Sequence, residues 1–203
     1  MKISQPIFRL CLSIFFVFGM FQSANGQMVD SMSKVILDKV EKEYASYETM
    51  RYKSKLTVEK YGLSSQFEFS TSKSKFRVVD DNEIAVTDGK RMISKSKTTN
   101  RVSEESFDET ISLLWFKKLN DFCTNNCKVI YLEDYQMGEL TTHVLRVESL
   151  NDDLEIGIIE LYIDNENYRV QQFVSITEDM ATMSFYNFEL NPTFPDDYFE
   201  IKD

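Results

Sequence analysis

The stretch from Ser74 to Lys95, SKFRVVDDNEIAVTDGKRMISK, constrains the fold of this chain more than any other. Two separators interrupt it, Asp80-Asp81-Asn82 and Asp88-Gly89. Both are typical of turns, because Asp and Asn hydrogen-bond their own backbone and Gly accepts a positive φ. The separators leave three short candidate strands, at residues 76–79, 83–87 and 91–94. The sequence therefore predicts a three-stranded antiparallel meander.

Apolar residues in each of these strands recur at every second position, and charged residues hold positions of the other phase. We expect one face of the meander to carry the apolar set: Phe76, Val78, Ile84, Val86 and Met92, with Ile93 as the alternative to Met92. That face covers either an ordinary filled core or a cavity. The rest of the chain has to distinguish these two structures.

Residues 1–26 resemble a secretory signal peptide. Lys2 and Arg9 precede or enter an apolar run at residues 7–21, and the small residues Ala24 and Gly26 suit cleavage before residue 27. The run is shorter than the roughly 20 residues that span a bilayer. We expect a mature domain of residues 27–203 with no membrane span; retention of the run as an anchor is the alternative.

The composition excludes one class of partner. The full chain has a formal net charge of -10, and removal of Lys2 and Arg9 with the leader makes it two units more negative. Nucleic-acid binding needs clustered Lys and Arg to displace counterions. We therefore expect no nucleic-acid partner. No Pro/Gly/Ser-rich linker or internal repeat divides the mature chain, which indicates one domain.

An amphipathic helix opens the mature chain. Its apolar stripe recurs at spacings of three and four, a plausible cap is Asp30 or Ser31, and it ends near Tyr47. The stripe comprises Val29, Met32, Ile36, Val40 and Tyr44. A strand of about ten residues follows, with Met50, Tyr52, Ser54, Leu56 and Val58 in one phase. After Gly62 a further strand places Phe67 and Phe69 on one side.

Residues 106–122, SFDETISLLWFKKLNDF, form the most apolar stretch of the mature chain. Residues 108–110 suit a helix start, and Ile111, Leu114, Trp115, Leu119 and Phe122 form a stripe that Leu113 and Phe116 widen. In a chain dominated by strands, such a helix must lie across the apolar face of the sheet. The same pattern fits a helix that plugs the core of an ordinary α+β domain.

The second half of the chain alternates again. Turn signals separate five candidate strands, at residues 128–133, 140–148, 154–163, 168–176 and 180–190. The apolar phase slips within 154–163, so we expect a bulge near Ile158. About eleven strands in sequential hairpins are too many for a flat sheet. The sequence predicts an α+β, mainly β fold, a curled and incompletely closed antiparallel β-barrel.

Residues suited to catalysis are scarce. The chain lacks a Gly-rich phosphate loop, a nucleophile elbow and a dinucleotide fingerprint. Its single histidine, His143, lies within a predicted strand, and adjacent acids such as Asp80-Asp81 point apart in turns. We expect no catalytic residue, no metal site and no cofactor. A periplasmic hydrolase is the alternative from this class.

Cys123 and Cys127 are the only cysteines of the predicted mature chain. Export would deliver them to an oxidising compartment, so a disulfide across the turn after the apolar helix is our first interpretation. Free buried thiols are the second. A metal site ranks third, because two cysteines without a nearby histidine leave a tetrahedral ion half coordinated.

The order of these elements resembles the LolA-type outer-membrane lipoprotein carriers. The resemblance is carried by the leader, the helix that enters a long strand, Lys75-Phe76-Arg77, the turn Val86-Thr87-Asp88-Gly89-Lys90, the apolar helix, Glu160-Leu161-Tyr162-Ile163-Asp164 and the closing NPTFPDDYF at residues 191–199. One departure concerns the arginine that fastens the lid in that family. Residues 71–74 of this chain read Thr-Ser-Lys-Ser instead, so no lid-locking arginine is carried over.

The resemblance implies a curled, incompletely closed barrel with helices as a lid on its concave side, above a cavity for acyl chains. It implies a monomeric periplasmic carrier of a Gram-negative cell, with acylated lipoproteins as cargo, an inner-membrane lipoprotein-releasing ABC transporter and an outer-membrane acceptor as partners, and no cofactor. A LolA-fold sensor or adaptor without transport is the alternative. The expected cavity lining is Met32, Ile36, Met50, Tyr52, Leu56, Val58, Phe67, Phe69, Phe76, Val78, Ile84, Val86, Met92, Leu114 and Trp115.

Overall fold

The computed structural model describes residues 28–73, 75–87, 91–106, 114–150, 158–176 and 179–201. The strands within these ranges are β1 (Met28–Val29), β2 (Thr49–Val58), β3 (Leu63–Ser72), β4 (Lys75–Val79), β5 (Glu83–Thr87), β6 (Arg91–Ser96), β7 (Val102–Ser106), β8 (Cys127–Met137), β9 (Leu140–Ser149), β10 (Ile158–Asp164), β11 (Val170–Ser175) and β12 (Ala181–Leu190). The described helices are α2 (Ser31–Ala45), α3 (Leu114–Asn126) and the short 3-10 helix η2 (Glu59–Tyr61).

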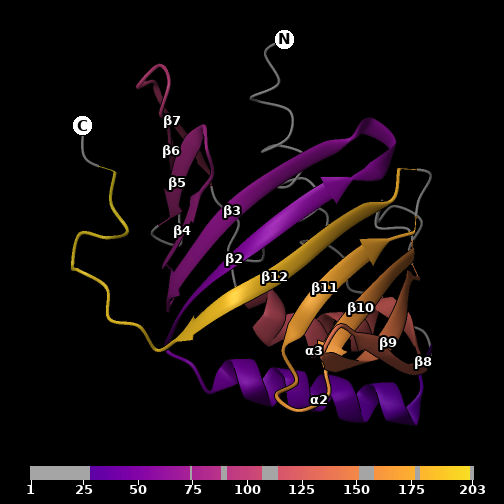
Figure 1. The fold of residues 1–203 in the computed structure, drawn as a ribbon. Helices are drawn as coiled ribbons and strands as arrows, with labels where there is room; N and C mark the ends of the chain where they lie inside the picture. Colours follow the sequence, from indigo (N-terminus) through magenta and orange to yellow (C-terminus); the bar gives the residue numbers. More distant parts are fainter. Residues whose placement is uncertain are drawn as a thin grey trace.

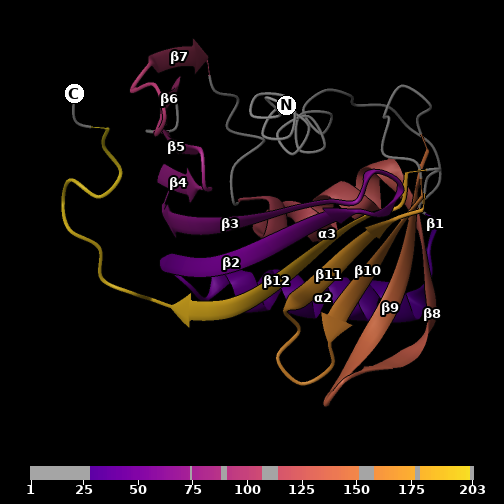
Figure 2. The ribbon, with the colours of Figure 1, turned by 45° about the horizontal axis from the view of Figure 1, so that its top comes forward.

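All the described strands belong to one sheet, in the order β1-β8-β9-β10-β11-β12-β2-β3-β4-β5-β6-β7. Every pair in it is antiparallel except β1, which adds to β8 in parallel. The sheet curls, and β1 and β7 remain as separate edges (Figure 2). The predicted curled and incompletely closed antiparallel barrel is confirmed.

Helix α2 runs past one end of the strands (Figure 1) and is fixed at its N-terminus by Asp30. The Asp30 carboxylate accepts hydrogen bonds from the backbone N–H groups of Met32 and Ser33, both at 2.9 Å, and from the N–H of Tyr131 in β8 at 2.6 Å. A cap that also binds the sheet sets the rotation of the helix. The buried stripe is Ser33, Ile36, Leu37, Val40 and Tyr44.

The expected position of Met32 in this stripe is wrong. Its side chain is 45% exposed, whereas Ser33, the next residue, is fully buried. The Asp30 cap accounts for the difference, because it also accepts from the Ser33 hydroxyl at 2.7 Å and so holds Ser33 toward β8. Met32 is thereby turned to solvent and does not line the concave face.

Helix α3 starts later and ends later than the sequence indicates. Strand β7 continues to Ser106, residues 107–113 lie outside the described part, and the helix extends to Asn126. Phe116 stacks on Tyr44 of α2 with ring centroids 4.6 Å apart and meets Phe185 of β12 edge-on at 5.3 Å. Through these contacts both helices lie on one side of the sheet, which is its concave side, as expected.

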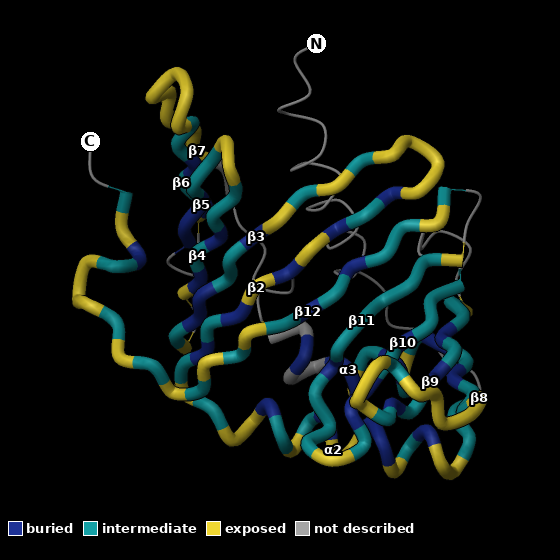
Figure 3. The backbone as a smooth tube through the Cα atoms, in the orientation of Figure 1, coloured by how far each residue is buried: buried dark blue, intermediate teal, exposed yellow. Residues whose placement is uncertain are grey.

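Strand register identifies the residues that share this concave face, because direct partners in an antiparallel pair point to the same side. Strand β2 alternates between buried and more exposed positions along its length (Figure 3), and its buried set is Met50, Tyr52, Ser54, Leu56 and Val58. Across the neighbouring strands Tyr52 aligns with Phe69, Val78 and Ala85. A second row contains Met50, Thr71, Phe76, Thr87 and Met92.

The same register shows that two expected lining residues face the other way. Val86 pairs with Arg77, and Ile84 pairs with Val79, so both lie on the convex face. The turn between β4 and β5 sets this phase: Asp80 accepts hydrogen bonds from the N–H groups of Asn82 at 2.8 Å and Glu83 at 2.6 Å. Val86 is buried there all the same, at 3% exposure.

A C-terminal strap, residues 191–201, crosses the convex face over β2, β3 and β4. Ser70 and Tyr198 share a hydrogen bond between their hydroxyls at 3.0 Å. Arg77 donates from Nη1 to the carbonyl oxygen of Tyr198 at 3.0 Å, and the Arg51 guanidinium carbon lies 5.1 Å from the Phe194 ring centroid. These contacts bind the strap to three neighbouring strands through one residue of each.

The predicted bulge near Ile158 falls at the edge of the described residues. Strand β10 begins at that residue, and positions 154–157 lie outside the description. Within β10 the pairing with β11 shifts between Tyr162 and Ile163. The second apolar phase, with Leu161 in it, is the one that points to the concave side.

Candidate ligand-binding face

The concave face is apolar and centred on an aromatic group. Tyr52 stacks on Phe69 with ring centroids 5.1 Å apart and on Phe188 at 5.5 Å, and it meets Phe185 edge-on at 5.9 Å. Phe116 of α3 approaches the same group, 6.0 Å from Tyr52. Rings at these distances attract one another and bury large apolar areas.

Ten of the expected lining residues come together here. One buried cluster contains Ile36, Met50, Tyr52, Leu56, Val58, Phe67, Phe76, Val78 and Met92, and Phe69 packs against it. Met32 is exposed, and Ile84 and Val86 lie on the convex face. The backbones of Leu114 and Trp115 belong to α3, but their side chains lie outside the description.

The sequence interpretation missed several members of this cluster. Leu37 of α2, Phe185 of β12 and Leu145 of β9 are all almost fully buried in it. The alternation of Met183 and Phe185 within residues 180–190 was a usable signal for β12. Leu37 lies three residues before Val40 and seven before Tyr44, which is also helical spacing, but the expected stripe ran through Ile36 alone at this turn.

Part of the apolar face is incompletely covered. Phe69, Phe173, Phe188 and Leu190 are of intermediate exposure while they pack against the buried cluster. By register or ring contact each belongs to the concave side. Aromatic surface that is half exposed inside a curled sheet is typical of a binding site for an apolar ligand.

The positive charge of the strands is confined to one face. In the described strands every Lys and Arg occupies a convex position of the register, including Arg51, Arg77 and Lys95. The full set is Arg51, Lys53, Lys55, Lys75, Arg77, Arg91, Lys95, Lys128 and Arg146. Burial, and to a smaller extent the neighbouring Tyr44, raises the pKa of Tyr52 well above its ordinary value. The hydroxyl therefore stays neutral.

The polar groups on the concave face differ in their hydrogen bonding. Thr87 donates from Oγ1 to the carbonyl oxygen of Arg91 at 2.8 Å, and the hydroxyls of Ser94 and Ser103 lie 2.8 Å apart. Ser54 is fully buried, and its Oγ has no hydrogen-bond partner. Its strand partners on either side are Phe67 and Phe185.

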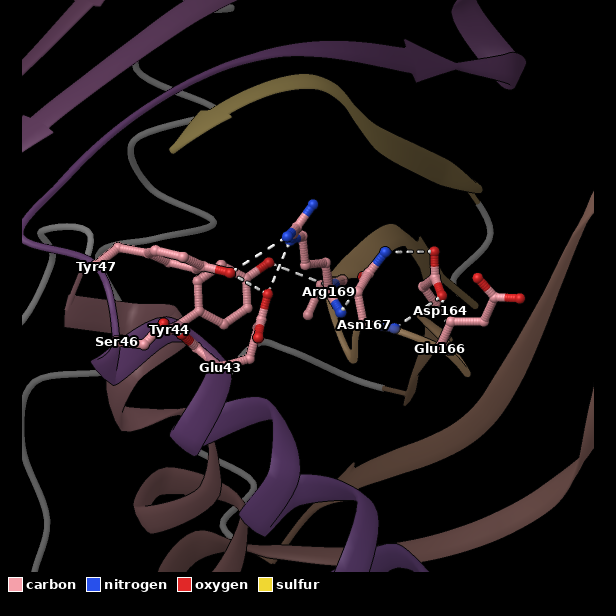
Figure 4. A network of polar contacts seen from close by, with 9 residues as sticks. Glu43, Tyr44, Ser46, Tyr47, Asp164, Glu166, Asn167 and Arg169 are labelled. Carbon is pink, nitrogen blue, oxygen red and sulfur yellow. Dashed lines mark hydrogen bonds and ion pairs between the residues drawn. The ribbon is translucent and has the colours of Figure 1, made fainter. Parts of the chain in front are cut away.

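Arg169, in the turn between β10 and β11, fastens helix α2 (Figure 4). It donates from Nε to Glu43 Oε1 at 3.0 Å and from Nη2 to the hydroxyl of Tyr47 at 3.2 Å, and this hydroxyl also donates to Glu43. The backbone N–H of Val170 donates to the hydroxyl of Tyr44 at 3.1 Å. These contacts hold α2 where the sequence offered no lid-locking arginine.

The turn that presents Arg169 is itself ordered by Asp164. This buried carboxylate accepts hydrogen bonds from the N–H of Glu166 at 2.8 Å and from the side-chain amide of Asn167 at 2.9 Å (Figure 4). Asn167 Oδ1 in turn accepts from the N–H of Arg169 at 3.0 Å. Hydrogen bonds within the turn therefore fix the position from which Arg169 reaches α2.

The two helices are joined through Asn120 of α3. Its amide donates to Asp38 at 2.8 Å and to Glu41 at 2.7 Å, and its oxygen accepts from Lys34 at 3.2 Å. Asn120 is itself buried, and its three partners all belong to α2. These hydrogen bonds therefore join α3 to α2.

The structure replaces the expected disulfide with two free thiols. Cys123 and Cys127 are both 1% exposed and unbridged. The sequence placed them across a turn, but α3 continues to Asn126, so Cys123 sits in its last turns and Cys127 begins β8. A hydrogen bond to Cys127, followed by burial, raises the pKa of the Cys123 thiol well above its ordinary value.

Among the described residues, no group of three side chains could hold a metal ion. His143 faces Asp134, with Nδ1 and Oδ1 2.6 Å apart, and its ring packs between Tyr131 and Tyr168. None of the helices in this part of the chain is long and apolar enough to span a membrane.

A separate polar pocket of about 810 Å³ lies beneath the C-terminal strap. Its lining includes Glu48, Lys73, Lys75 and Asp196, which balance in charge. By register Thr49, Ser72 and Lys75 face the convex side. The pocket is therefore distinct from the apolar face.

Neither a protein-family model nor a curated protein matches this chain. Solved structures do match. An uncharacterized conserved protein from Thermus thermophilus has a TM-score of 0.58 and 16% identity over 83% of this chain and 97% of that one. The Mycobacterium tuberculosis lipoprotein LppX has a TM-score of 0.53 and 10% identity, over 82% of this chain and 100% of that one.

A LolA superfamily protein from Nitrosomonas europaea also matches, with a TM-score of 0.42 and 8% identity over 87% of this chain and 99% of that one. Identities this low show likeness of fold alone. This chain therefore shares its fold with LppX and with the Thermus thermophilus protein.

Proposed function

We propose that this protein is a periplasmic carrier that shields the acyl chains of lipoproteins on its concave face and ferries them from the inner to the outer membrane. One observation carries the proposal. An aromatic and aliphatic concave face, free of Lys and Arg in the described strands, is covered by two helices yet keeps half-exposed rings such as Phe69 and Phe188.

The physical case rests on the cost of exposing acyl chains to water. Each methylene moved from water into apolar surroundings gains ~0.8 kcal/mol. Lipoproteins with two or three chains therefore need a cover during transit. Long, adaptable side chains suit such a cover, and Met50, Met92 and Met183 all lie on the concave side.

The carrier role has consequences for partners and location. The proposed protein receives acylated lipoproteins from an inner-membrane ABC transporter and passes them to an outer-membrane acceptor. The proposed leader at residues 1–26 would place it in the periplasm, where it acts without a cofactor. The mature domain, residues 27–203, would work as a monomer.

Binding of a tri-acylated lipoprotein and of the neutral dye N-phenyl-1-naphthylamine tests the proposal. Phe69→Glu places a charge where hydrocarbon must sit, at a large desolvation cost, so we expect binding to weaken at least tenfold. The matched control is Ser64→Glu on the same strand, because Ser64 is exposed and belongs to the convex phase. Equal binding by wild type and Phe69→Glu would contradict an acyl-chain site on this face.

Transfer separates a carrier from a sensor or adaptor. The purified protein, loaded with a lipoprotein at inner-membrane vesicles, is mixed with outer-membrane vesicles, and the lipoprotein is followed by sedimentation. A carrier delivers its cargo. Binding without delivery would assign the protein to the sensor or adaptor class.

A further inference from the structure

A single buried hydroxyl interrupts the apolar face at its centre. Ser54 is 0% exposed, and its Oγ finds no hydrogen-bond partner. Two other hydroxyls of this face do have hydrogen-bond partners: those of Thr87 and Ser94, each at 2.8 Å. A buried hydroxyl without a partner lowers stability, because it has given up its hydrogen bonds to water.

The surroundings of Ser54 offer it no partner within the protein. The residues directly opposite on β3 and β12 are Phe67 and Phe185, and its neighbours on the same face of β2 are Tyr52 and Leu56. Phe116 of α3 approaches both Tyr52 and Phe185, with centroid distances of 6.0 and 5.3 Å. A ligand chain that displaces Phe116 from the sheet would therefore reach this hydroxyl.

The charge of the face determines what kind of group Ser54 can receive. Every Lys and Arg of the described strands points to the convex side, so the strands supply no cation to an ionised carboxylate buried on the concave face. Burial of a carboxylate without a cation is strongly unfavourable. A neutral carbonyl accepts a hydrogen bond without this penalty.

We propose that the Ser54 hydroxyl donates a hydrogen bond to the carbonyl oxygen of an esterified acyl chain, and that this face therefore selects neutral acyl esters over ionised fatty acids. The inference rests on the proposed acyl-chain binding and adds the polar group by which the ligand is recognised. Tyr52, a second neutral hydroxyl two residues away on the same face, lies beside the ester site.

The experiment compares three twelve-carbon probes on the full protein at pH 8: methyl laurate, sodium laurate and dodecane. Each displaces the neutral dye N-phenyl-1-naphthylamine, and the dissociation constants are compared. For wild type we expect methyl laurate to bind at least tenfold more tightly than either other probe. In Ser54→Ala the preference for the ester over dodecane falls about five- to tenfold, while dodecane binds as before.

Ser94→Ala is the matched control, since Ser94 is also a buried serine of this face but already pairs with Ser103. It should keep the ester preference. Thermal unfolding without ligand gives a second readout. Ser54→Ala should unfold at the same temperature as wild type or a higher one, whereas Ser94→Ala unfolds at a lower one.

Each possible result supports or overturns the inference. Loss of the ester preference in Ser54→Ala but not in Ser94→Ala supports the inference. An unchanged ratio of ester to dodecane affinity in Ser54→Ala overturns the role of Ser54, and laurate binding as tight as that of the ester overturns the selection for neutral ligands, both with the proposed function intact. Displacement of the dye by none of the probes from wild type overturns the proposed function and this inference with it.

Discussion

Arg77 lies with its guanidinium carbon 4.7 Å from the ring centroid of Tyr198 and donates from Nη1 to the carbonyl oxygen of the same residue at 3.0 Å. This double contact joins β4 to the C-terminal strap. Arg51 of β2 adds a second cation over Tyr198, at 5.7 Å. Two of the basic residues on the convex face, Arg51 and Arg77, thus hold the strap.

Tyr198→Ala should reduce the free energy of unfolding by about 2 kcal/mol, because it removes the cation–π contacts and leaves the buried hydroxyl of Ser70 unpaired. Urea unfolding measures this. Tyr61→Ala is the control, since Tyr61 also lies near a cation, Lys60, but is 57% exposed. It should cost less than about 0.5 kcal/mol. Equal losses in the two variants would mean that the strap is not tightly held.

Arg169→Met should free the C-terminal end of α2, because it leaves Glu43 and Tyr47 without their shared donor. Both charges of the pair are about three-quarters shielded, so we expect a loss of about 1 to 2 kcal/mol. Lys60→Met is the control, since its pair with Asp179 is about half exposed and should contribute little to stability.

Hydrogen exchange shows which elements loosen when Arg169 is removed. In Arg169→Met the amides of α2 should exchange faster, while those of β8 and β9 stay protected. An unchanged exchange rate in α2 would show that the Asp30 cap and the Asn120 contacts are sufficient to hold the helix.

Strand alternation predicted the architecture correctly, but it assigned the residues of β5 to the wrong faces of the sheet. The pattern in β2 identified Met50, Tyr52, Leu56 and Val58 correctly, because the convex side of that strand is charged. Strand β5 reads Glu-Ile-Ala-Val-Thr, and its larger apolar residues occupy the convex phase. Sequence reasoning assigns the larger residues to the core. It had no means to foresee that the C-terminal strap covers the convex side.

The candidate site was predictable to the extent that it depends on local alternation. Ile36 and Phe76 came from periodicity alone, whereas Met32 failed because a long-range hydrogen bond from Tyr131 to Asp30 fixes the helix rotation. The role of Arg169 was invisible for the same reason. Its partner Glu43 lies 126 positions earlier in the chain, and no short motif connects them.

The Asp30 cap should make part of the stability depend on pH. Burial alone would raise the pKa of Asp30, but hydrogen bonds from Ser33, Tyr131 and Met32 outweigh it and hold the pKa below 3.8. A depressed folded-state pKa stabilises the fold above the unfolded-state pKa of about 3.9 and loses this effect as the pH falls through the folded value.

Asp30→Asn tests this linkage. Urea unfolding at pH 7 should find wild type more stable than the variant by about 1 kcal/mol, because Asn still caps the helix but carries no charge. The difference should shrink below pH 4. Asp81→Asn, at an exposed turn position, is the control and should give a difference near zero at both pH values. A difference at Asp30 that stays constant as the pH falls from 7 into the acid unfolding range would contradict the linkage.

The two thiols of α3 and β8 give a prediction about accessibility. Cys123 and Cys127 are 1% exposed, and the thiolate that reacts with labelling reagents is disfavoured at Cys123 by its hydrogen bond to Cys127 and by burial. In a chain carrying Cys11→Ser, the native protein isolated without reductant should therefore label slowly with a maleimide. Unfolding in guanidinium should expose both thiols at once.

An added Ser64→Cys provides the control, because Ser64 is exposed on β3 and a thiol there should label within the mixing time. If native labelling without this substitution were equally fast, the packing around α3 would be looser than described. If the unfolded, unreduced protein offered no thiol, the pair would be bridged.

The free thiols lie at the junction where α3 meets β8, so a bridge there would tie the helix to the sheet. Comparison of α3 hydrogen exchange before and after oxidation with diamide then measures how much that junction moves, and we expect slower exchange only in the oxidised protein.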